Sequence, residues 1–486
     1  MEKLKRNSIL KNIIHLFFST SLASALNAIV LIVLATYLQS YYYGMFSVIL
    51  AFAMIMGYFT DAGLSSIVLR EGSKKETNLS ILVSSYIKMR MGLLFATFVI
   101  GFAVIHVSNQ NHQEMIEAAY IFILPMVTGV ALQSIGTTYF QLTERMQYYG
   151  LIKVTSSVFL VAGICIGFLF NLSPFSIYLL YGSSYLAAGV FALYLVHKNS
   201  KIRLNSKFHK GILQNFVSFT LSGLLFVLLP QLGPIVLEKA ISLNEVGLFA
   251  VAYRIPQALQ QIPMIIAGAF SPVLFRAFHD HRLSDHLRYS LSMIKMMALA
   301  GMMMTIPIYY MADWVIEILF GEKWAAAALP MKILSVILIL QAVNIALADG
   351  LTTRGLQNYR TLVQAISVLS GMLLYLFFSQ SYGVTGAALA GVLIEAIALL
   401  GFWLFNPNRW IIANKAIIPY LSYFSICLFS IDRLLGTLSL LAASVHLLLL
   451  GLILLVDREV RQKMMNYIKR VTGGKMRNQG VSRGMK

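Results

Sequence analysis

The sequence has little charge and almost no cysteine. Only 12% of its 486 residues are charged, and two are cysteines. An average soluble domain carries roughly 25% charged residues, so the chain lacks the composition of a soluble surface. Cys165 and Cys427 both fall in apolar segments, and neither indicates a disulfide framework or a metal site.

The sequence also lacks the motifs of several function classes. It has no Gly-rich nucleotide-binding loop, so direct use of ATP is not expected. It has no cluster of metal-ligating residues, and we predict no metal and no cofactor. An acyltransferase would need a histidine beside an acidic or amide partner, whereas His446 stands alone in an apolar segment. We therefore predict no catalytic residues and do not expect an enzyme.

Long apolar runs are what the sequence has instead. Apolar and aromatic residues make up 58% of the chain, more than a soluble core of this length can bury. They fall in runs of about twenty, the length at which a helix crosses roughly 30 Å of hydrocarbon and satisfies its own backbone there. The sequence predicts an all-α integral membrane protein with about fourteen transmembrane helices. The predicted spans are 12–38, 44–69, 80–106, 115–138, 150–170, 174–196, 212–237, 246–272, 287–312, 326–349, 360–379, 383–405, 411–430 and 435–456.

The first span could be mistaken for a cleaved signal peptide, because Ala23-Ser24-Ala25 is similar to a cleavage site. Its apolar run continues to Leu38, however, which is too long for the apolar part of a signal peptide. We interpret it as a retained membrane span.

The net charge of +19 is distributed unevenly over the connecting segments. With the spans above, 33 of the 38 lysines and arginines fall on one side, Lys88 and Arg90 among them. This asymmetry follows the positive-inside rule and predicts that both ends of the chain are cytoplasmic. It makes an orientation signal a better explanation of the charge than nucleic-acid binding. The other basic residues are Lys239, Lys323 and Arg433 outside and Arg254 and Lys332 within spans.

The chain contains an internal repeat. Residues 11–48, which end in Gly44-Met45-Phe46-Ser47-Val48, align without gaps on residues 214–251, which end in Gly247-Leu248-Phe249-Ala250-Val251. The offset is 203 residues throughout. Six predicted spans separate the copies, so both begin on the same side of the membrane. Parallel repeats of this kind predict two lobes with a substrate site between them.

Several short motifs, in this order and on these spans, support a family resemblance. The sequence resembles the polysaccharide-transport branch of the multidrug/oligosaccharidyl-lipid/polysaccharide exporter superfamily, the Wzx-like flippases of lipid-linked oligosaccharides. The resemblance covers nearly the whole chain. Its motifs are Tyr43-Gly44-Met45-Phe46-Ser47, Asp61-Ala62-Gly63-Leu64, Arg70-Glu71, Val246-Gly247-Leu248-Phe249, Ala252-Tyr253-Arg254, Ser271-Pro272-Val273-Leu274 and Tyr382-Gly383-Val384-Thr385-Gly386-Ala387-Ala388-Leu389-Ala390.

The resemblance implies two six-helix lobes in a V shape with two further helices. We assign residues 1–211 to the first lobe and linker, 212–405 to the second lobe, 406–456 to the last two spans and 457–486 to a basic cytoplasmic tail that lies on the membrane. It also implies that a polyprenyl-pyrophosphate-linked oligosaccharide is moved from the inner to the outer leaflet of a prokaryotic cytoplasmic membrane. Expected partners are membrane lipids, H+ or Na+, and a polysaccharide polymerase with other assembly proteins.

Polar residues inside spans are the candidates for a substrate cavity. Arg254 lies eight residues beyond Val246, about 12 Å below the outer surface, and a guanidinium suits a pyrophosphate. The alternative is a structural ion pair. Gln257 and Gln261 follow at helical spacing, and Asn27, Gln231 and Gln341 are also deep; each can line the cavity or join helices.

Two acidic residues are candidates for ion coupling. Asp61 lies about eight residues from the inner end of the second span. Its functional roles would be ion coupling or pairing with a cavity arginine, and the alternative is a hydrogen bond that fixes the inner end of the helix beside Arg70. Glu395 lies about 18 Å into the twelfth span and is a candidate for proton or sodium coupling; otherwise it pairs within the second lobe. Lys332 is near an outer end, where its long side chain can reach the membrane surface.

Other functions remain as alternatives. A membrane glycan polymerase or ligase shares this composition, but the predicted outer loops are short. A drug/cation antiporter of the same fold favours an acidic cavity, and a peptidoglycan-precursor flippase favours several cationic residues in the first lobe. Spans one and two offer only Asn27 and Asp61 there.

Overall fold

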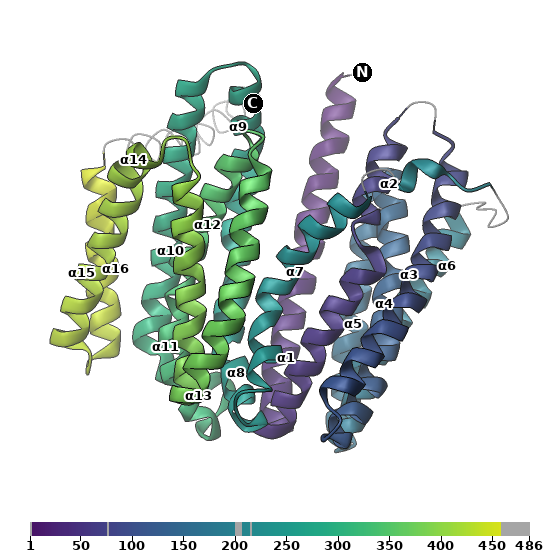
Figure 1. The fold of residues 1–486 in the computed structure, drawn as a ribbon, viewed down its shortest axis with the longest axis horizontal. Helices are drawn as coiled ribbons and strands as arrows, with labels where there is room; N and C mark the ends of the chain where they lie inside the picture. The colour runs from purple at the N-terminus through teal and green to yellow at the C-terminus, as the bar shows by residue number, and fades with distance from the viewer. Residues whose placement is uncertain (1, 75–76, 200–206, 214–215, 458–486) are drawn as a thin grey trace, which may run out of the picture. The chain divides into compact units, whose positions relative to one another are not determined.

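The computed structural model describes residues 2–74, 77–199, 207–213 and 216–457. This part of the chain is helical with short connections, and it contains no strand (Figure 1). The predicted membrane-bound tail, 457–486, lies outside the described residues except for Asp457. The elements are α1 (Glu2–Asp61), α2 (Leu64–Gly72), α3 (Leu79–Ser108), α4 (Gln113–Leu142), α5 (Met146–Leu169), α6 (Pro174–Asn199), η1 (Lys210–Leu213), α7 (Phe216–Leu237), α8 (Leu243–Leu259), α9 (Gln261–His279), α10 (Leu283–Phe320), η2 (Glu322–Ala327), α11 (Ala328–Ser335), α12 (Ile337–Thr352), α13 (Gln357–Leu404), α14 (Arg409–Ile412), the π-helix η3 (Ala413–Ile417), α15 (Ile418–Leu435) and α16 (Ser439–Val456).

The predicted spans all coincide with helical segments, so the all-α fold of a multi-pass membrane protein is confirmed. Among the described residues, 10 helical segments are long and apolar enough to cross a membrane. Two of these, Phe18–Gly72 and Gln357–Leu404, each contain two predicted spans. The shorter apolar helices Gly223–Leu237 and Ser439–Ile453 match the seventh and fourteenth predicted spans.

Single residues bend the chain where loops are expected between adjacent spans. Gln39 interrupts α1 with φ 60° and ψ 178°, and Gly383 interrupts α13 with φ 57°. Gly383 adopts this conformation without steric cost because it lacks a Cβ. Gln39 has no such freedom, so its backbone is strained. At the inner end of the second span, Ala62 and Gly63 also have positive φ and separate α1 from α2.

The chain packs into two compact units. The first unit comprises Met1–Arg254, Leu319–Ala327 and Val368–Ala387. The second comprises Ile255–Ile318, Ala328–Ser367 and Ala388–Lys486. The predicted division into lobes at residue 211 stays a prediction, and each unit is described below by itself.

The first unit is built around helices α3, α4, α5 and α6, which run side by side (Figure 1). Glycines allow α4 and α6 to pack closely. A Cβ at Gly129 would overlap the backbone of Tyr185, and one at Gly182 would lie 2.6 Å from the Phe122 carbonyl oxygen. Close backbone approach through small residues is typical of helix packing in membranes.

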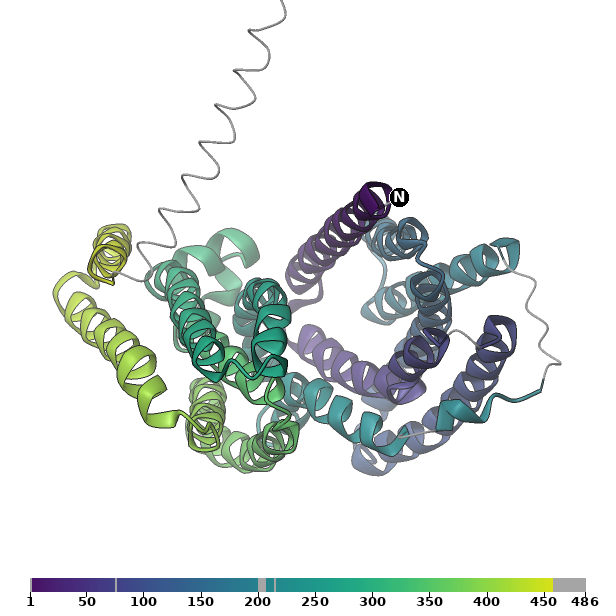
Figure 2. The same ribbon diagram turned by 90° about the horizontal axis from the view of Figure 1, so that it is seen from above.

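The second unit has an apolar core formed mainly by α10, α12, α13, α15 and α16. Figure 2 shows the neighbouring pair α15 and α16, which Tyr423 connects by donating a hydrogen bond to the Leu449 carbonyl at 2.8 Å. His446 is buried in this core, and its Nδ1 lies 3.2 Å from the Tyr310 hydroxyl. It is a packed core residue there.

The two copies of the sequence repeat contact each other inside the first unit. A Cβ at Gly44 of α1 would overlap the carbonyl oxygen of Leu243, and a Cβ at Gly247 of α8 would overlap that of Ser40. Because Leu243 is the repeat equivalent of Ser40, each glycine packs against the residue four positions before the other glycine. Beside them the Ser40 hydroxyl donates to the Asn244 side-chain oxygen at 2.7 Å. The repeated glycines therefore form a self-complementary contact, in which each copy presents the same surface.

This contact predicts that alanine destabilises the protein at both repeated glycines. Gly44→Ala and Gly247→Ala are each expected to destabilise the purified protein by about 1–3 kcal/mol, because the overlapping atoms are backbone and cannot rotate away. Gly92→Ala in α3 is the control, since a Cβ there meets nothing within 4 Å. The measurement is the thermal unfolding midpoint in detergent. Equal midpoints for all three variants would show that the glycine contact contributes nothing.

Candidate functional site

Arg254 lies in α8 and is partly buried. Two hydroxyl groups of α1 accept hydrogen bonds from its side chain. Its Nε donates to the Tyr43 hydroxyl oxygen at 2.9 Å, and a terminal nitrogen donates to the Ser47 hydroxyl at 3.5 Å. The guanidinium also lies over the Tyr43 ring, 5.7 Å from its centroid. These contacts hold the guanidinium against α1.

Aromatic rings surround this arginine site. Tyr43 stacks on Phe46 at 5.8 Å and meets Trp324 edge to face at 5.9 Å. Phe46 in turn contacts Tyr181 at 5.1 Å. The Tyr43 hydroxyl donates to the Leu31 carbonyl at 3.1 Å, which fixes the ring. We call Arg254, Tyr43, Ser47 and Trp324 the arginine site. Of these four residues, the sequence identified only the arginine as a candidate. The other three come close to it through the packing of α1, α8 and η2, which the sequence does not reveal.

The two glutamines predicted to extend the arginine's helical face lie on different helices. Gln257 is in α8, three residues after Arg254, and is partly buried. The α8 helix ends at Leu259, and Gln261 begins α9 with an exposed side chain. Prolines at 256 and 263 lack the amide hydrogens that would continue one regular helix. Helical spacing alone therefore does not place Gln261 on the face of Arg254.

The three other substrate candidates occupy separate places. Asn27 in α1 accepts a hydrogen bond from the Ser157 hydroxyl of α5 at 3.2 Å, so it joins two helices. Gln231 is partly buried in α7, beside Pro230. Gln341 belongs to α12 of the second unit, where its Oε1 is buried and has no hydrogen-bond partner among the described residues.

Asp61 is paired with a buried arginine. The Arg90 side chain in α3 is 1% exposed and forms an ion pair with Asp61. It also donates from Nε to the Ala131 carbonyl at 2.9 Å and from another nitrogen to the Tyr86 hydroxyl at 3.0 Å. The Ser65 hydroxyl donates to Asp61 at 2.5 Å. This network connects α1, α2, α3 and α4 at the break between α1 and α2.

Arg90, which the sequence places among the cytoplasmic cations, is buried between helices, and its side of the membrane stays a prediction. Arg90 lies eleven residues after Leu79, where α3 begins, so about 16 Å along the helix, and its side chain is enclosed by other helices. The signal that could have identified it is its position inside the predicted span 80–106. The structure pairs Asp61 with an arginine, and its role in ion coupling stays a prediction.

The ion pair predicts strong coupling between two substitutions. Removing one member leaves the other charge buried and unpaired, which costs about 3–5 kcal/mol. We expect Asp61→Ala and Arg90→Met each to lower the thermal midpoint markedly, and the double variant to lose much less than the sum. Additive losses in this double-mutant cycle would contradict a structural pair.

Glu395 pairs with an amide in the second unit. It lies in α13, is 9% exposed and accepts a hydrogen bond at Oε2 from Asn344 Nδ2 of α12 at 2.7 Å. The same nitrogen donates to the Glu395 backbone carbonyl at 2.9 Å. Glu395 therefore pairs with a neutral amide of the same unit. It forms no ion pair within the described ranges.

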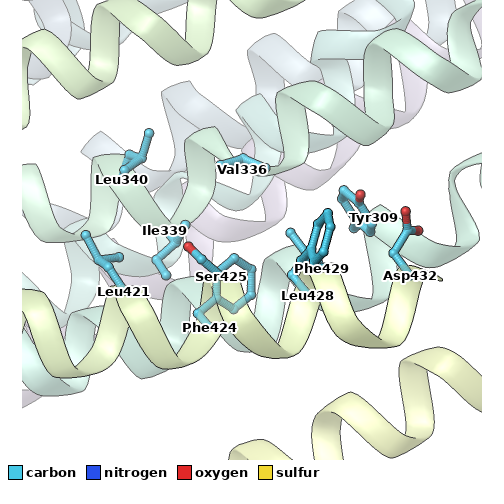
Figure 3. Close-up of a pocket in the computed structure, with 10 residues that line it drawn as sticks. All are labelled: Tyr309, Val336, Ile339, Leu340, Leu421, Phe424, Ser425, Leu428, Phe429 and Asp432. Carbon is cyan, nitrogen blue, oxygen red and sulfur yellow. The ribbon is translucent and has the colours of Figure 1, made fainter. Parts of the chain in front are cut away.

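An apolar pocket of about 240 Å³ also lies in the second unit. Figure 3 shows it between side chains of α10, α12 and α15, with Tyr309 and Asp432 together at one end. Asp432 is already paired, since it accepts from Lys332 at 2.9 Å, and the Lys332 ammonium lies 4.5 Å from the centroid of the Tyr309 ring. Asp432, the charged residue that lines the pocket, is an anion and is already paired, so the pocket does not suit a pyrophosphate. The arginine site is the better candidate for the head group.

Comparison with known proteins decides the family. The family model described as "Polysaccharide biosynthesis protein" matches residues 9–278, more than half of the chain. The chain belongs to this family. A search of curated proteins finds no significant match to this chain.

Solved structures show that this polysaccharide biosynthesis family member shares its fold with known membrane transporters. The structure described as lipid II flippase MurJ, inward closed conformation, is 15% identical, has a TM-score of 0.67, and the match covers 92% of this chain and 99% of that chain. An inward-facing multidrug resistance MATE family transporter of the MOP superfamily is 15% identical with a TM-score of 0.67, over 83% and 98% of the two chains. A MOP superfamily transporter from Pyrococcus furiosus is 16% identical with a TM-score of 0.57, over 83% and 96%. At these identities the likeness establishes the fold alone.

Proposed function

We propose that the protein is a flippase that moves a polyprenyl-pyrophosphate-linked oligosaccharide from the inner to the outer leaflet of a prokaryotic cytoplasmic membrane. Its lobes would alternate access between the two sides, driven by an ion gradient or the membrane potential, with both termini cytoplasmic. It is a transporter and not an enzyme. The observation that supports this proposal is a partly buried arginine, within a predicted span, that donates to two hydroxyl groups in a member of the polysaccharide biosynthesis family.

The transport problem defines what such a protein must supply. A sugar–pyrophosphate head group cannot cross about 30 Å of hydrocarbon alone, because each unsatisfied polar group there costs several kcal/mol. The protein must offer polar partners within the membrane, while the polyprenyl tail remains in lipid. The arginine site provides such partners in the first unit.

Exchange of hydrogen-bond partners explains how Arg254 would bind and release the head group. A hydrogen bond between a guanidinium and an oxyanion is roughly twice as strong as one between neutral groups. A pyrophosphate therefore displaces the Tyr43 and Ser47 hydroxyls from Arg254, and these hydroxyls cover the guanidinium again when the head group leaves. Trp324 and Tyr43 are buried and pack against each other, so they support the site from behind.

Two features favour an oligosaccharide carrier over the alternatives of the same fold. The family model that the chain matches is described as a polysaccharide biosynthesis protein, which favours a glycan over a drug or a cation as the substrate. The buried Arg90 is already engaged by Asp61, so it does not add a second cation for a more anionic head group. The product would be passed to a polysaccharide polymerase on the outer side.

Substitution of Arg254 tests the proposal. In proteoliposomes with a labelled lipid-linked oligosaccharide, we expect Arg254→Ala to reduce flipping about 10- to 100-fold, since a hydrogen bond to a charged group contributes about 1.5–3 kcal/mol. Arg254→Lys should retain an intermediate rate because it keeps the charge and loses the planar fork. Arg288→Ala is the control, as its side chain is 60% exposed and pairs with Asp285. Full activity of Arg254→Ala would remove the arginine site from the mechanism.

Removal of the Tyr43 hydroxyl tests the exchange itself. If the hydroxyl competes with the head group for Arg254, Tyr43→Phe should lower the apparent KM for the lipid-linked oligosaccharide, by up to about fivefold for a neutral hydrogen bond of about 1 kcal/mol. Tyr41→Phe is the matched control, because its hydroxyl donates to Glu114 at 3.0 Å instead. An apparent KM that rises in Tyr43→Phe would contradict competition.

A further inference from the structure

The α7 helix, which lies in the second copy of the sequence repeat, is bonded near its start to α1 of the first copy. The Thr220 hydroxyl donates to the Ala62 carbonyl oxygen, just beyond the end of α1, at 2.8 Å. In the opposite direction, the Tyr58 hydroxyl of α1 donates to the Thr220 carbonyl oxygen at 2.6 Å. Three residues further along α7, a Cβ at Gly223 would lie 2.4 Å from the Tyr58 hydroxyl. The contact therefore continues over one turn of α7.

The break between α1 and α2 supplies the acceptor for this bond. The last carbonyl groups of a helix have no partner within the helix, and α1 ends at Asp61. Ala62 and Gly63 follow with φ 46° and 81°, so the helix does not continue. Ala62 is buried, and an unpaired carbonyl in a buried position is costly. The break that the Asp61–Arg90 pair holds is therefore also a docking point for α7.

A second attachment lies at the other end of α7. Lys239 comes two residues after this helix ends, and its ammonium donates to the Ser108 carbonyl oxygen at 2.5 Å and to the Asn109 side-chain oxygen at 2.9 Å. Ser108 is the last residue of α3, and Asn109 is its C-cap. A cation at this place satisfies terminal carbonyl groups and the negative end of the helix dipole. Lys239 also pairs with its neighbour Glu238 at 2.9 Å.

The two attachments are far apart along the helix. Thr220 and Lys239 are separated by 19 positions, which is about 28 Å at the rise of an α-helix and close to the thickness of the hydrocarbon layer. Between them, Pro230 and Pro234 interrupt the regular hydrogen bonding of α7, so one attachment alone would hold only one half of the helix. The helix also packs on α1 and α2 (Figure 1). Both halves of α7 are thus connected to the first unit.

We propose that α7, although it belongs to the second copy of the sequence repeat, is fastened to the first unit at both ends and moves with that unit. All four residues of the arginine site belong to the first unit as well. A head group bound at this site would therefore stay with α7 and the first unit during the conformational change. This last role rests on the proposed flippase function, whereas the fastening of α7 does not.

Distances between two spin labels test the fastening without any glycan. The full-length protein, with both native cysteines changed to serine, would carry nitroxides at Phe226 of α7 and Val104 of α3, which are both exposed. Thr220→Val combined with Lys239→Met should widen the distance distribution about twofold or more, because a released helix samples more positions.

The matched control is Thr128→Val combined with Lys415→Met. The Thr128 hydroxyl donates within its own helix, to the Leu124 carbonyl oxygen, and Lys415 is exposed. The control should leave the distribution unchanged. An unchanged distribution in Thr220→Val with Lys239→Met, or equal widening in the control, would overturn the proposal.

A cross-link tests whether α7 moves with the first unit. Ser108→Cys and Lys239→Cys would be joined in proteoliposomes by a short, flexible and reducible thiol reagent, with the single Ser108→Cys variant as control. Flipping should stay within about twofold of the rate before cross-linking, because a link inside one rigid body removes no motion. Loss of flipping that a reductant restores would overturn the proposal and leave the proposed function intact. Where no flipping occurs before cross-linking, the proposed function fails, and the label distances still decide the fastening.

Discussion

A charged side chain within a hydrocarbon layer must have a partner, and this requirement organises the polar interior of the protein. Arg90 and Asp61 meet it by pairing with each other, with further bonds to hydroxyl and backbone groups. Arg254 has neutral hydroxyls and an aromatic face, and Glu395 has a neutral amide. In each cluster the polar partner comes from a different helix than the charged residue, so helix packing assembles the cluster.

The kind of partner indicates which groups can exchange partners. A charge already paired and hydrogen-bonded gains little from a ligand, so the Asp61 network is suited to holding the break between α1 and α2. A guanidinium that donates to neutral hydroxyls can exchange these hydroxyls for a phosphate oxyanion, which forms stronger hydrogen bonds. In the proposed function, Arg254 binds an anion in this way. The self-complementary glycine contact lies on the same pair of helices as the arginine site, which connects the sequence repeat with the proposed chemistry.

The fold could be predicted from the sequence to a large extent because the bilayer restricts it. Apolar runs of a set length must be helices, and all predicted spans coincide with helices. Single-residue breaks such as Gln39 could not be predicted, since a glutamine with positive φ contradicts its local preference. The candidate site was predicted only in part. Depth in a span identified Arg254 and Glu395, but their partners Tyr43 and Asn344 come from other helices, and the burial of Arg90 depends on packing that a hydropathy pattern does not contain.

Binding of the head group at Arg254 can be tested by proximity labelling. A photoreactive benzoylphenylalanine at Ser47, whose hydroxyl lies 3.5 Å from the guanidinium, would be irradiated in membranes that contain a radiolabelled lipid-linked oligosaccharide. The same probe at Phe95, which is 72% exposed, reports contact with bulk lipid. If the head group binds at Arg254, a labelled adduct should form at position 47, and Arg254→Ala should abolish it. Labelling at position 47 that is unaffected by Arg254→Ala, or labelling only at position 95, would contradict it.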